Sequence, residues 1–275
     1  MIERMTSPSW NPEKYLGFEA ERARPFDDLV ARIAAAAPVD VVDLGCGPGN
    51  VTRTLLDRWP DAWVRGIDSS PDMVDRAARV AAEVPGGRLT FELGDVRQWR
   101  PAGPVDVIVA NAVLHWIPEH LHLMRRWLHV LRPGGSLAVQ MPGNAAGGAA
   151  AAVAAVVGSP RWAGVFEGVA TSGGLAAEGT AVRTPAEYAD VLGTEGAVVD
   201  AWETTYVHVL PGDDPVLEWY GGSGLRPYFD RLTGSGGDLD AFRADLAASL
   251  RDAFPPKSYG TLLPFRRVFV VARRP

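Results

Sequence analysis

The sequence has a single cysteine, no long hydrophobic run and no excess of positive charge. Cys46 alone cannot form an internal disulfide or a thiolate metal cluster, which excludes a disulfide-stabilised secreted scaffold and a zinc ribbon. Apolar stretches such as residues 105–110 and 268–272 are far shorter than the roughly 20 residues of a membrane-spanning helix, and residues 1–10 lack the apolar run of a signal peptide. We therefore expect a cytoplasmic protein in a reducing compartment, with no membrane partner.

Positive charge is in deficit, because 27 Lys and Arg face 33 Asp and Glu and give a net charge of −6. Binding to DNA or RNA requires a summed positive surface, so this balance argues against a nucleic-acid partner. The sequence shows no Ser-His-Asp pattern with a nucleophile elbow, and its five histidines have no metal-ligand spacing. His120 and His122 fall at the start of a predicted helix, where we expect a solvated face. We predict no metal and no nucleophilic residue.

The chain contains instead an alternation of short β-branched runs and helical stretches over residues 39–141, which is typical of a parallel sheet with crossover helices. The predicted fold class is a doubly wound α/β unit. We predict strands at residues 39–44, 63–68, 89–93, 105–110, 137–141, 199–210 and 265–272. Helical stretches are predicted at residues 51–59, 71–83, 119–130, 185–193 and, with interruptions, 215–254, while residues 143–157 are rich in Ala and Gly.

A glycine-rich loop follows the first predicted strand and opens the first predicted helix. Gly45, Gly47 and Gly49 let the backbone turn sharply and let a ligand approach without meeting a Cβ. Their spacing, Gly-x-Gly-x-Gly, differs from the Gly-x-Gly-x-x-Gly that seats a dinucleotide pyrophosphate. Asp43, two residues before Gly45, would repel a pyrophosphate and attract the ammonium group of a methionine moiety.

Acidic residues also end the next two strands. Asp68 is placed to accept hydrogen bonds from ribose hydroxyls, a role equally compatible with NAD. Asp95 follows the third strand, where an adenine amino group would lie in a methyltransferase. Three acidic strand ends around one glycine loop favour S-adenosylmethionine, and they disfavour the alternative of an NAD(P)-dependent oxidoreductase.

Four motifs, at residues 41–49, 66–73, 94–96 and 131–135, together resemble those of the S-adenosylmethionine-dependent methyltransferase family with a Rossmann-like fold. The resemblance implies a seven-stranded sheet whose last strand is antiparallel and inserted beside the fifth. It implies S-adenosyl-L-methionine as cofactor and S-adenosyl-L-homocysteine as product. The cofactor-binding residues that it implies are Asp43, Gly45, Gly47, Gly49, Asp68, Ser69, Met73, Asp95, Val96 and Asn111.

A closer resemblance, to trans-aconitate methyltransferases, extends over nearly the whole chain. The similar segments are residues 10–16, 21–25, 111–116, 139–144, 202–208, 224–227 and 264–272, whereas residues 147–179 depart from the family in their scarcity of charge. The family implies methyl transfer to a carboxylate of trans-aconitate, which gives a monomethyl ester. It also implies a single methyltransferase domain over 1–275, with an amino-terminal segment, 1–30, over the site and a helical cap over the carboxyl ends of the strands, formed by insertions 143–182 and 211–262.

A tricarboxylate that approaches an acidic protein needs local cations, and arginine pairs with carboxylates through two coplanar donors. Arg226, in a glycine-rich turn, is the strongest candidate. His115, at the end of the fourth strand, is expected to position the acceptor or line its pocket, because a carboxylate with a pKa of about 4 is already ionised and needs no base. We therefore predict no catalytic group, only proximity and orientation. The candidate substrate-binding residues are Tyr15, Arg22, Arg24, His115, Trp116, Tyr206, Arg226, Arg266 and Arg267.

Two alternatives share the same cofactor motifs. One is a methyltransferase that acts on another small carboxylic acid or a natural product. The other is a non-catalytic S-adenosylmethionine-binding module, which would need no arginine-rich second site.

Overall fold

The computed structural model describes residues 19–143, 147–167, 182–222 and 224–275. Among the predicted substrate residues, Tyr15 lies outside these ranges. The chain divides into two compact units. The larger contains Arg22–Met141, Val182–Glu203 and Val268–Pro275, and the smaller contains Met1–Glu21, Pro142–Ala181 and Thr204–Arg267. None of the described helices has the length and hydropathy to cross a membrane.

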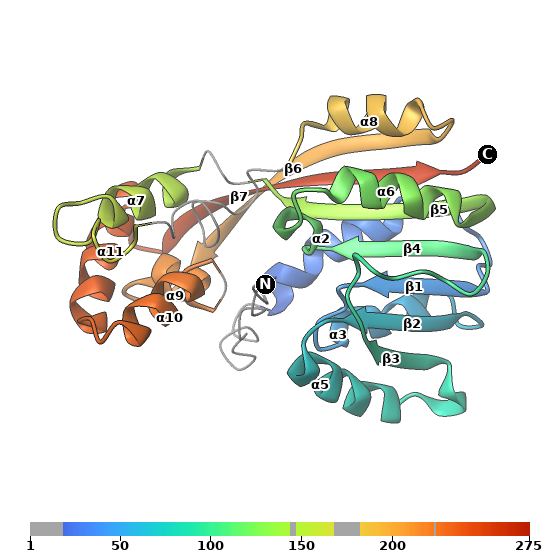
Figure 1. The fold of residues 1–275 in the computed structure, drawn as a ribbon, viewed down its shortest axis with the longest axis horizontal. Coiled ribbons are helices and arrows are strands. Elements are labelled where there is room, and N and C mark those ends of the chain that lie inside the picture. The colour runs from blue at the N-terminus through green and yellow to red at the C-terminus, as the bar shows by residue number, and fades with distance from the viewer. Residues whose placement is uncertain (1–18, 144–146, 168–181, 223) are drawn as a thin grey trace, which may run out of the picture. The chain divides into compact units, whose positions relative to one another are not determined.

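Seven strands form one sheet in the order β3-β2-β1-β4-β5-β7-β6 (Figure 1). Neighbours from β3 to β5 pair in parallel. Strand β7 is antiparallel to β5, because Gly143 donates to the carbonyl of Arg266 while the earlier Gly134 donates to that of Arg274. The predicted seven-stranded sheet, with its last strand reversed and beside the fifth, is confirmed. The strands are β1 Asp40–Leu44, β2 Trp63–Asp68, β3 Leu89–Leu93, β4 Val105–Asn111, β5 Leu131–Pro142, β6 Val198–Leu210 and β7 Thr261–Arg273.

Helices of the larger unit cover its sheet because the central strands are apolar on both faces. On one face, Val42 and Ile108 pack with Trp127 of α6 and Tyr188 of α8 in a single buried cluster. Alternate residues of the same strands, Asp43 among them, point to the opposite face. The helices of this unit are α2 Glu19–Ala31, α3 Asn50–Arg53, α4 Leu55–Arg58, α5 Pro71–Ala82, α6 His120–His129 and α8 Pro185–Gly193.

The smaller unit has a separate core. Trp162, Phe166 and Phe242 pack edge to face or tilted, with ring centroids about 5 Å apart, among aliphatic side chains of the surrounding helices. The strands contribute Leu210 at the end of β6 and Leu263 and Phe265 near the start of β7. Within the described residues of this unit, the helices are α7 Gly148–Val157, α9 Pro215–Gly221, α10 Arg226–Gly234 and α11 Leu239–Ala253.

Two local differences from the sequence predictions have physical causes. The helix predicted over residues 51–59 is two short helices, α3 and α4, which meet at Thr54. The fifth strand, predicted from residue 137, begins at Leu131. Leu131 already pairs with Val105 of β4, and the passage from there to Ser136 has an irregular register. At Gly135 a Cβ would lie 2.8 Å from the carbonyl oxygen of Asp106, so this passage requires glycine.

The prediction of a solvated His120 is wrong, although His122 is exposed. The Ile117 carbonyl lies 2.9 Å from His120 Nδ1 and can only accept, so Nδ1 carries the proton and Nε2 accepts from the Tyr188 hydroxyl at 2.8 Å. Burial lowers the pKa of His120, which keeps the ring neutral and suited to this arrangement. The pair connects α6 to α8 inside the larger unit.

Among the described residues, Tyr188 is the one hydrogen-bond donor to His120 Nε2, so Tyr188→Phe removes that donor and leaves the nitrogen buried. We expect the free energy of unfolding to fall by about 1–3 kcal/mol, measured by urea denaturation at pH 7. Tyr259→Phe, at a side chain that is 63% exposed, is the matched control and should change stability by less than about 0.5 kcal/mol. Equal effects of the two substitutions would contradict a stabilising role for the His120–Tyr188 hydrogen bond.

Candidate functional site

The glycine loop after β1 has a left-handed backbone and one open position. Gly45, Gly47 and Gly49 have φ values of 80°, 55° and 82°, a conformation that favours glycine. A Cβ on Gly45 would lie 2.7 Å from the side chain of Val113, and one on Gly49 would lie 2.5 Å from Phe91. A Cβ on Gly47 would meet nothing within 4 Å. Gly47 therefore has the free space that a ligand approaching the backbone requires.

Asp43, on β1, is a buried acid with one unsatisfied oxygen. Its Oδ2 accepts a 2.6 Å hydrogen bond from Thr52 of α3, while Oδ1 is buried with no partner among the described residues. Burial raises the pKa of Asp43 to about 7, the Thr52 hydrogen bond opposes this rise, and the negative charge of Asp68 adds to it. A cationic ligand group beside Oδ1 would supply the missing partner.

Asp68, at the end of β2, holds the loop in place. Its Oδ2 accepts from the Gly47 N–H and its Oδ1 from the Ser70 N–H, both at 2.9 Å. Ser70 also caps α5 by accepting from the N–H of Met73, whose side chain is buried. Ser69, between them, is exposed. The Asp68 carboxylate thus fixes the glycine loop to the start of α5, and this structural role is separate from its predicted contact with a ribose.

Asp95 is already paired in the structure. Arg97 donates to both of its carboxylate oxygens through side-chain nitrogens 2.7–3.0 Å away, and these bonds are the main cause that lowers the pKa of Asp95. Val96 between them is buried. A contact between Asp95 and an adenine amino group would have to use the lone pairs that Arg97 leaves.

The end of β4 brings Asn111 to the same edge of the sheet. Its Oδ1 is buried with no partner among the described residues. The next residue, Ala112, has a φ of 55°, a left-handed conformation that is strained for a residue with a Cβ, and its N–H donates to the Gln140 carbonyl at 2.9 Å. The chain therefore turns sharply away from the sheet directly after Asn111.

His115 and Trp116 follow in the short 3-10 turn η2, Leu114–Trp116. The His115 ring is buried, with its centroid 4.6 Å from that of Trp116. On α2, Arg24 is exposed, and Arg22 belongs to the same helix.

Cys46 in the glycine loop is an inert thiol, because burial and the charges of Asp43 and Asp68 raise its pKa.

The other predicted arginines lie in the smaller unit in three different settings. Arg226 is the first residue of α10, not part of a turn as predicted, and its Nε lies 2.9 Å from Asp230 Oδ1. Arg266 donates to the Gly143 carbonyl at 3.1 Å. Arg267 is only 6% exposed, and its guanidinium carbon lies 4.3 Å from the centroid of the Phe265 ring.

Phe265 belongs to an aromatic cluster around Arg267. Its ring centroid is 5.6 Å from that of Trp219 and 6.3 Å from that of His208, and His208 stacks on Tyr206 at 6.4 Å. Buried aromatic rings make a low-dielectric setting, in which a guanidinium binds a carboxylate more strongly than in water. Two predicted substrate residues, Tyr206 and Arg267, are thereby connected through His208 and Phe265.

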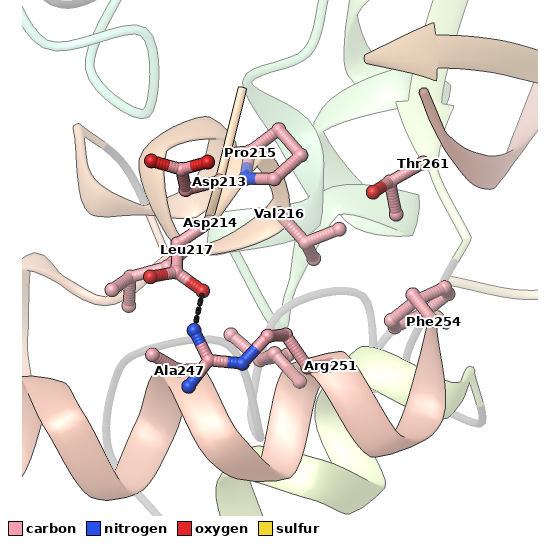
Figure 2. Close-up of a pocket in the computed structure, with 10 residues that line it drawn as sticks. Asp213, Asp214, Pro215, Val216, Leu217, Ala247, Arg251, Phe254 and Thr261 are labelled. Atoms are coloured by element: carbon pink, nitrogen blue, oxygen red, sulfur yellow. Dashed lines mark hydrogen bonds and ion pairs between the residues drawn. The ribbon is translucent and has the colours of Figure 1, made fainter. Parts of the chain in front are cut away.

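A small pocket, also in the smaller unit, lies between the start of α9 and the last turns of α11 (Figure 2). Asp214 and Arg251 form a 2.6 Å ion pair across it, and Val216 and Phe254 supply apolar walls. None of the predicted site residues lines this pocket. We assign it no role in the chemistry.

Sequence reasoning missed the partners that organise these residues. The roles of Thr52 and Arg97 could not be predicted, because they depend on the hydrogen bonds that these side chains form with Asp43 and Asp95 in the folded chain. Gln140 had a signal, since it is a polar residue inside the apolar run 137–141 of a predicted buried strand.

Comparison with known proteins decides the family. A methyltransferase-domain model matches residues 41–135. Trans-aconitate 2-methyltransferase of Streptomyces coelicolor is 46% identical over 273 residues, which are 98% of this chain and 88% of that protein. The Mycobacterium tuberculosis protein of the same name is 44% identical over 264 residues, 96% of each chain. The chain belongs to the trans-aconitate 2-methyltransferase family. It is a methyltransferase, as the motifs predicted.

Solved structures support the fold. YcgJ of Bacillus subtilis matches with a TM-score of 0.58 at 12% identity, covering 91% of this chain and 98% of that one. A phosphoethanolamine N-methyltransferase of Haemonchus contortus, solved with S-adenosylhomocysteine, matches with a TM-score of 0.55 at 14% identity, covering 92% and 52%. The [4+2]-cyclase SpnF matches equally well, at 0.55 and 19%, covering 98% and 87%. One fold thus supports different reactions, so the reaction has to be inferred from the residues of the site.

The raised pKa of Asp43 predicts proton release when S-adenosylmethionine binds. The folded pKa lies above the unfolded value, so the stability that protonated Asp43 contributes is present below pH about 4 and is lost as the pH rises through about 7. An ammonium group beside Oδ1 favours the ionised form and lowers this pKa. At pH 7 we expect binding to release about half a proton from Asp43, measured by calorimetry in buffers of different ionisation enthalpy.

Asp43→Asn should bind the cofactor more weakly and abolish that proton release. Asp40→Asn, at the other end of β1, is the matched control and should keep both the affinity and the release. Identical proton release from wild type and Asp43→Asn would remove Asp43 from the ammonium site.

Proposed function

We propose that the protein transfers a methyl group from S-adenosylmethionine to a carboxylate of trans-aconitate, giving a monomethyl ester and S-adenosylhomocysteine. The observation that carries this proposal is identity of 44–46% to trans-aconitate 2-methyltransferases over 96–98% of the chain. The geometry of the larger unit fits the cofactor. Gly47 leaves open space, and two buried acceptors, Asp43 Oδ1 and Asn111 Oδ1, await donors such as an ammonium group.

In this proposal the ends of β1, β2, β3 and β4 bind the cofactor. Asp43 and Asn111 take the methionine moiety, Asp68 takes the ribose, and Asp95 takes the adenine with Met73 packed beneath it. The glycine loop gives close backbone approach. For the acceptor, we propose that Arg267 of the smaller unit binds a distal carboxylate.

The chemistry asks little of the protein beyond alignment. The cofactor supplies a methyl group already activated on a sulfonium. The acceptor carboxylate is ionised at neutral pH, so no residue has to remove a proton. His115 and Trp116 wall the reacting region. The remaining contribution is to hold a carboxylate oxygen in line with the methyl group and to exclude water, effects that reach several kcal/mol.

Transfer of isotope-labelled methyl groups to a panel of di- and tricarboxylates tests the proposal. We expect trans-aconitate to be the best acceptor, with a base-labile ester as product. A better acceptor outside the tricarboxylates would replace the substrate. Tight cofactor binding with no transfer to any acid would indicate a non-catalytic binding module.

Arg267→Met should lower kcat/KM for trans-aconitate at least tenfold, with unchanged affinity for S-adenosylmethionine, because the distal carboxylate loses a desolvated partner. Arg267→Lys should recover only part of the loss, since an ammonium lacks the two-pronged geometry. Arg161→Met is the matched control, because Arg161 also lies over an aromatic ring, 4.9 Å from Trp162, but is exposed. Unaltered kinetics in a folded Arg267→Met enzyme would move the search to Arg226 and Arg266.

A further inference from the structure

Gln140, on β5, is a buried amide without hydrogen-bond partners. Its side chain is 0% exposed, and neither Oε1 nor Nε2 has a partner among the described residues. An amide that is shut off from water and left unpaired opposes folding. Such a group in a ligand-free structure is expected to pair in the ligand-bound state.

The strand register places Gln140 beside the candidate cofactor residues. Gln140 on β5 is level with Asn111 on β4, and Val109, two residues before Asn111, is level with Asp43 on β1. Because side chains alternate between faces, Asp43, Asn111 and Gln140 all point to the same face of the sheet. This face is opposite to the one packed against α6 and α8. Three polar side chains, each with a buried and unpaired atom, thus lie on adjacent strands near their carboxyl ends.

Charge distinguishes what Gln140 can bind. Methyl transfer brings a carboxylate anion to a sulfonium cation and leaves both neutral, so a guanidinium at the reacting carboxylate would stabilise the charged reactants more than the transition state. A neutral amide donor orients the same carboxylate with a smaller penalty. Its positive Nε2 end suits the anion.

We propose that Gln140 positions the carboxylate that receives the methyl group, donating from Nε2 to the oxygen that does not react. This inference rests on the proposed function. The second oxygen forms the new O–C bond with one of its lone pairs as the C–S bond breaks, and the electron pair of that bond stays on sulfur. No proton moves.

Gln140→Met tests the proposal, because Met has a similar length and no hydrogen-bonding amide. In the ligand-free enzyme we expect it to raise the Tm by about 2 °C or more, since an unpaired buried amide is removed. We expect trans-aconitate to bind at least tenfold more weakly to the complex with S-adenosylhomocysteine, by calorimetry, and kcat/KM to fall at least as much. Affinity for S-adenosylmethionine should stay unchanged. Gln140→Asn should recover part of the acceptor binding.

Ser136→Ala is the matched control. Ser136 is also buried and unpaired at Oγ on the same face of β5, but it lies four residues before Gln140, in the middle of the strand and away from its carboxyl end. It should leave acceptor binding and kinetics unchanged. A Gln140→Met enzyme with wild-type acceptor affinity would overturn the inference and leave the proposed function standing, and a loss of cofactor affinity would overturn it by assigning Gln140 to the cofactor. A wild-type enzyme that fails to methylate trans-aconitate would overturn the proposed function, and this inference with it.

Discussion

Parallel hydrogen bonding of β1 with β2 and β4 is the constraint on which the candidate site depends. The register sets Asp43 level with Gly66 on one side and Val109 on the other, so three strands end at one edge of the sheet. A slip of one residue would turn Asp43 toward the apolar face that Val42 and Leu44 occupy. Once the register is fixed, Asp68 needs only two backbone N–H groups to hold the glycine loop against the start of α5.

The site carries unfavourable electrostatics before a ligand arrives. Asp43 is buried close enough to Asp68 that their repulsion contributes to its raised pKa, and Asn111 and Gln140 keep unpaired polar atoms out of water. Such groups lower stability in the free protein and become favourable when a ligand of matching polarity binds. The candidate acids, Asp43, Asp68 and Asp95, all belong to the larger unit, whereas three of the five candidate arginines belong to the smaller unit.

Elements bounded by clear local signals could be predicted from the sequence. Strands Trp63–Asp68 and Leu89–Leu93 and helix Pro185–Gly193 have the predicted bounds, because β-branched alternation, Pro and Gly mark them directly. The setting of His120 could not be predicted, since it depends on Tyr188, which lies 68 residues away. Arg226 was predicted in a turn because glycines precede it, yet the next residue, Pro227, favours the first turn of a helix. The paired state of Asp95 depends on the rotamer of Arg97, which no spacing specifies.

The place of β7 in the sheet constrains the order in which the strands can pair as the chain is synthesised. β6 leaves the ribosome well before β7, but its position in the sheet lies on the far side of β7, so β6 has no neighbour to pair with when it emerges. Until β7 arrives, the edge of β5 is an unpaired template for wrong strands, including β6 itself. A nascent chain of this topology therefore exposes that edge until β7 has been synthesised. The same insertion makes β7 the strand that closes the sheet.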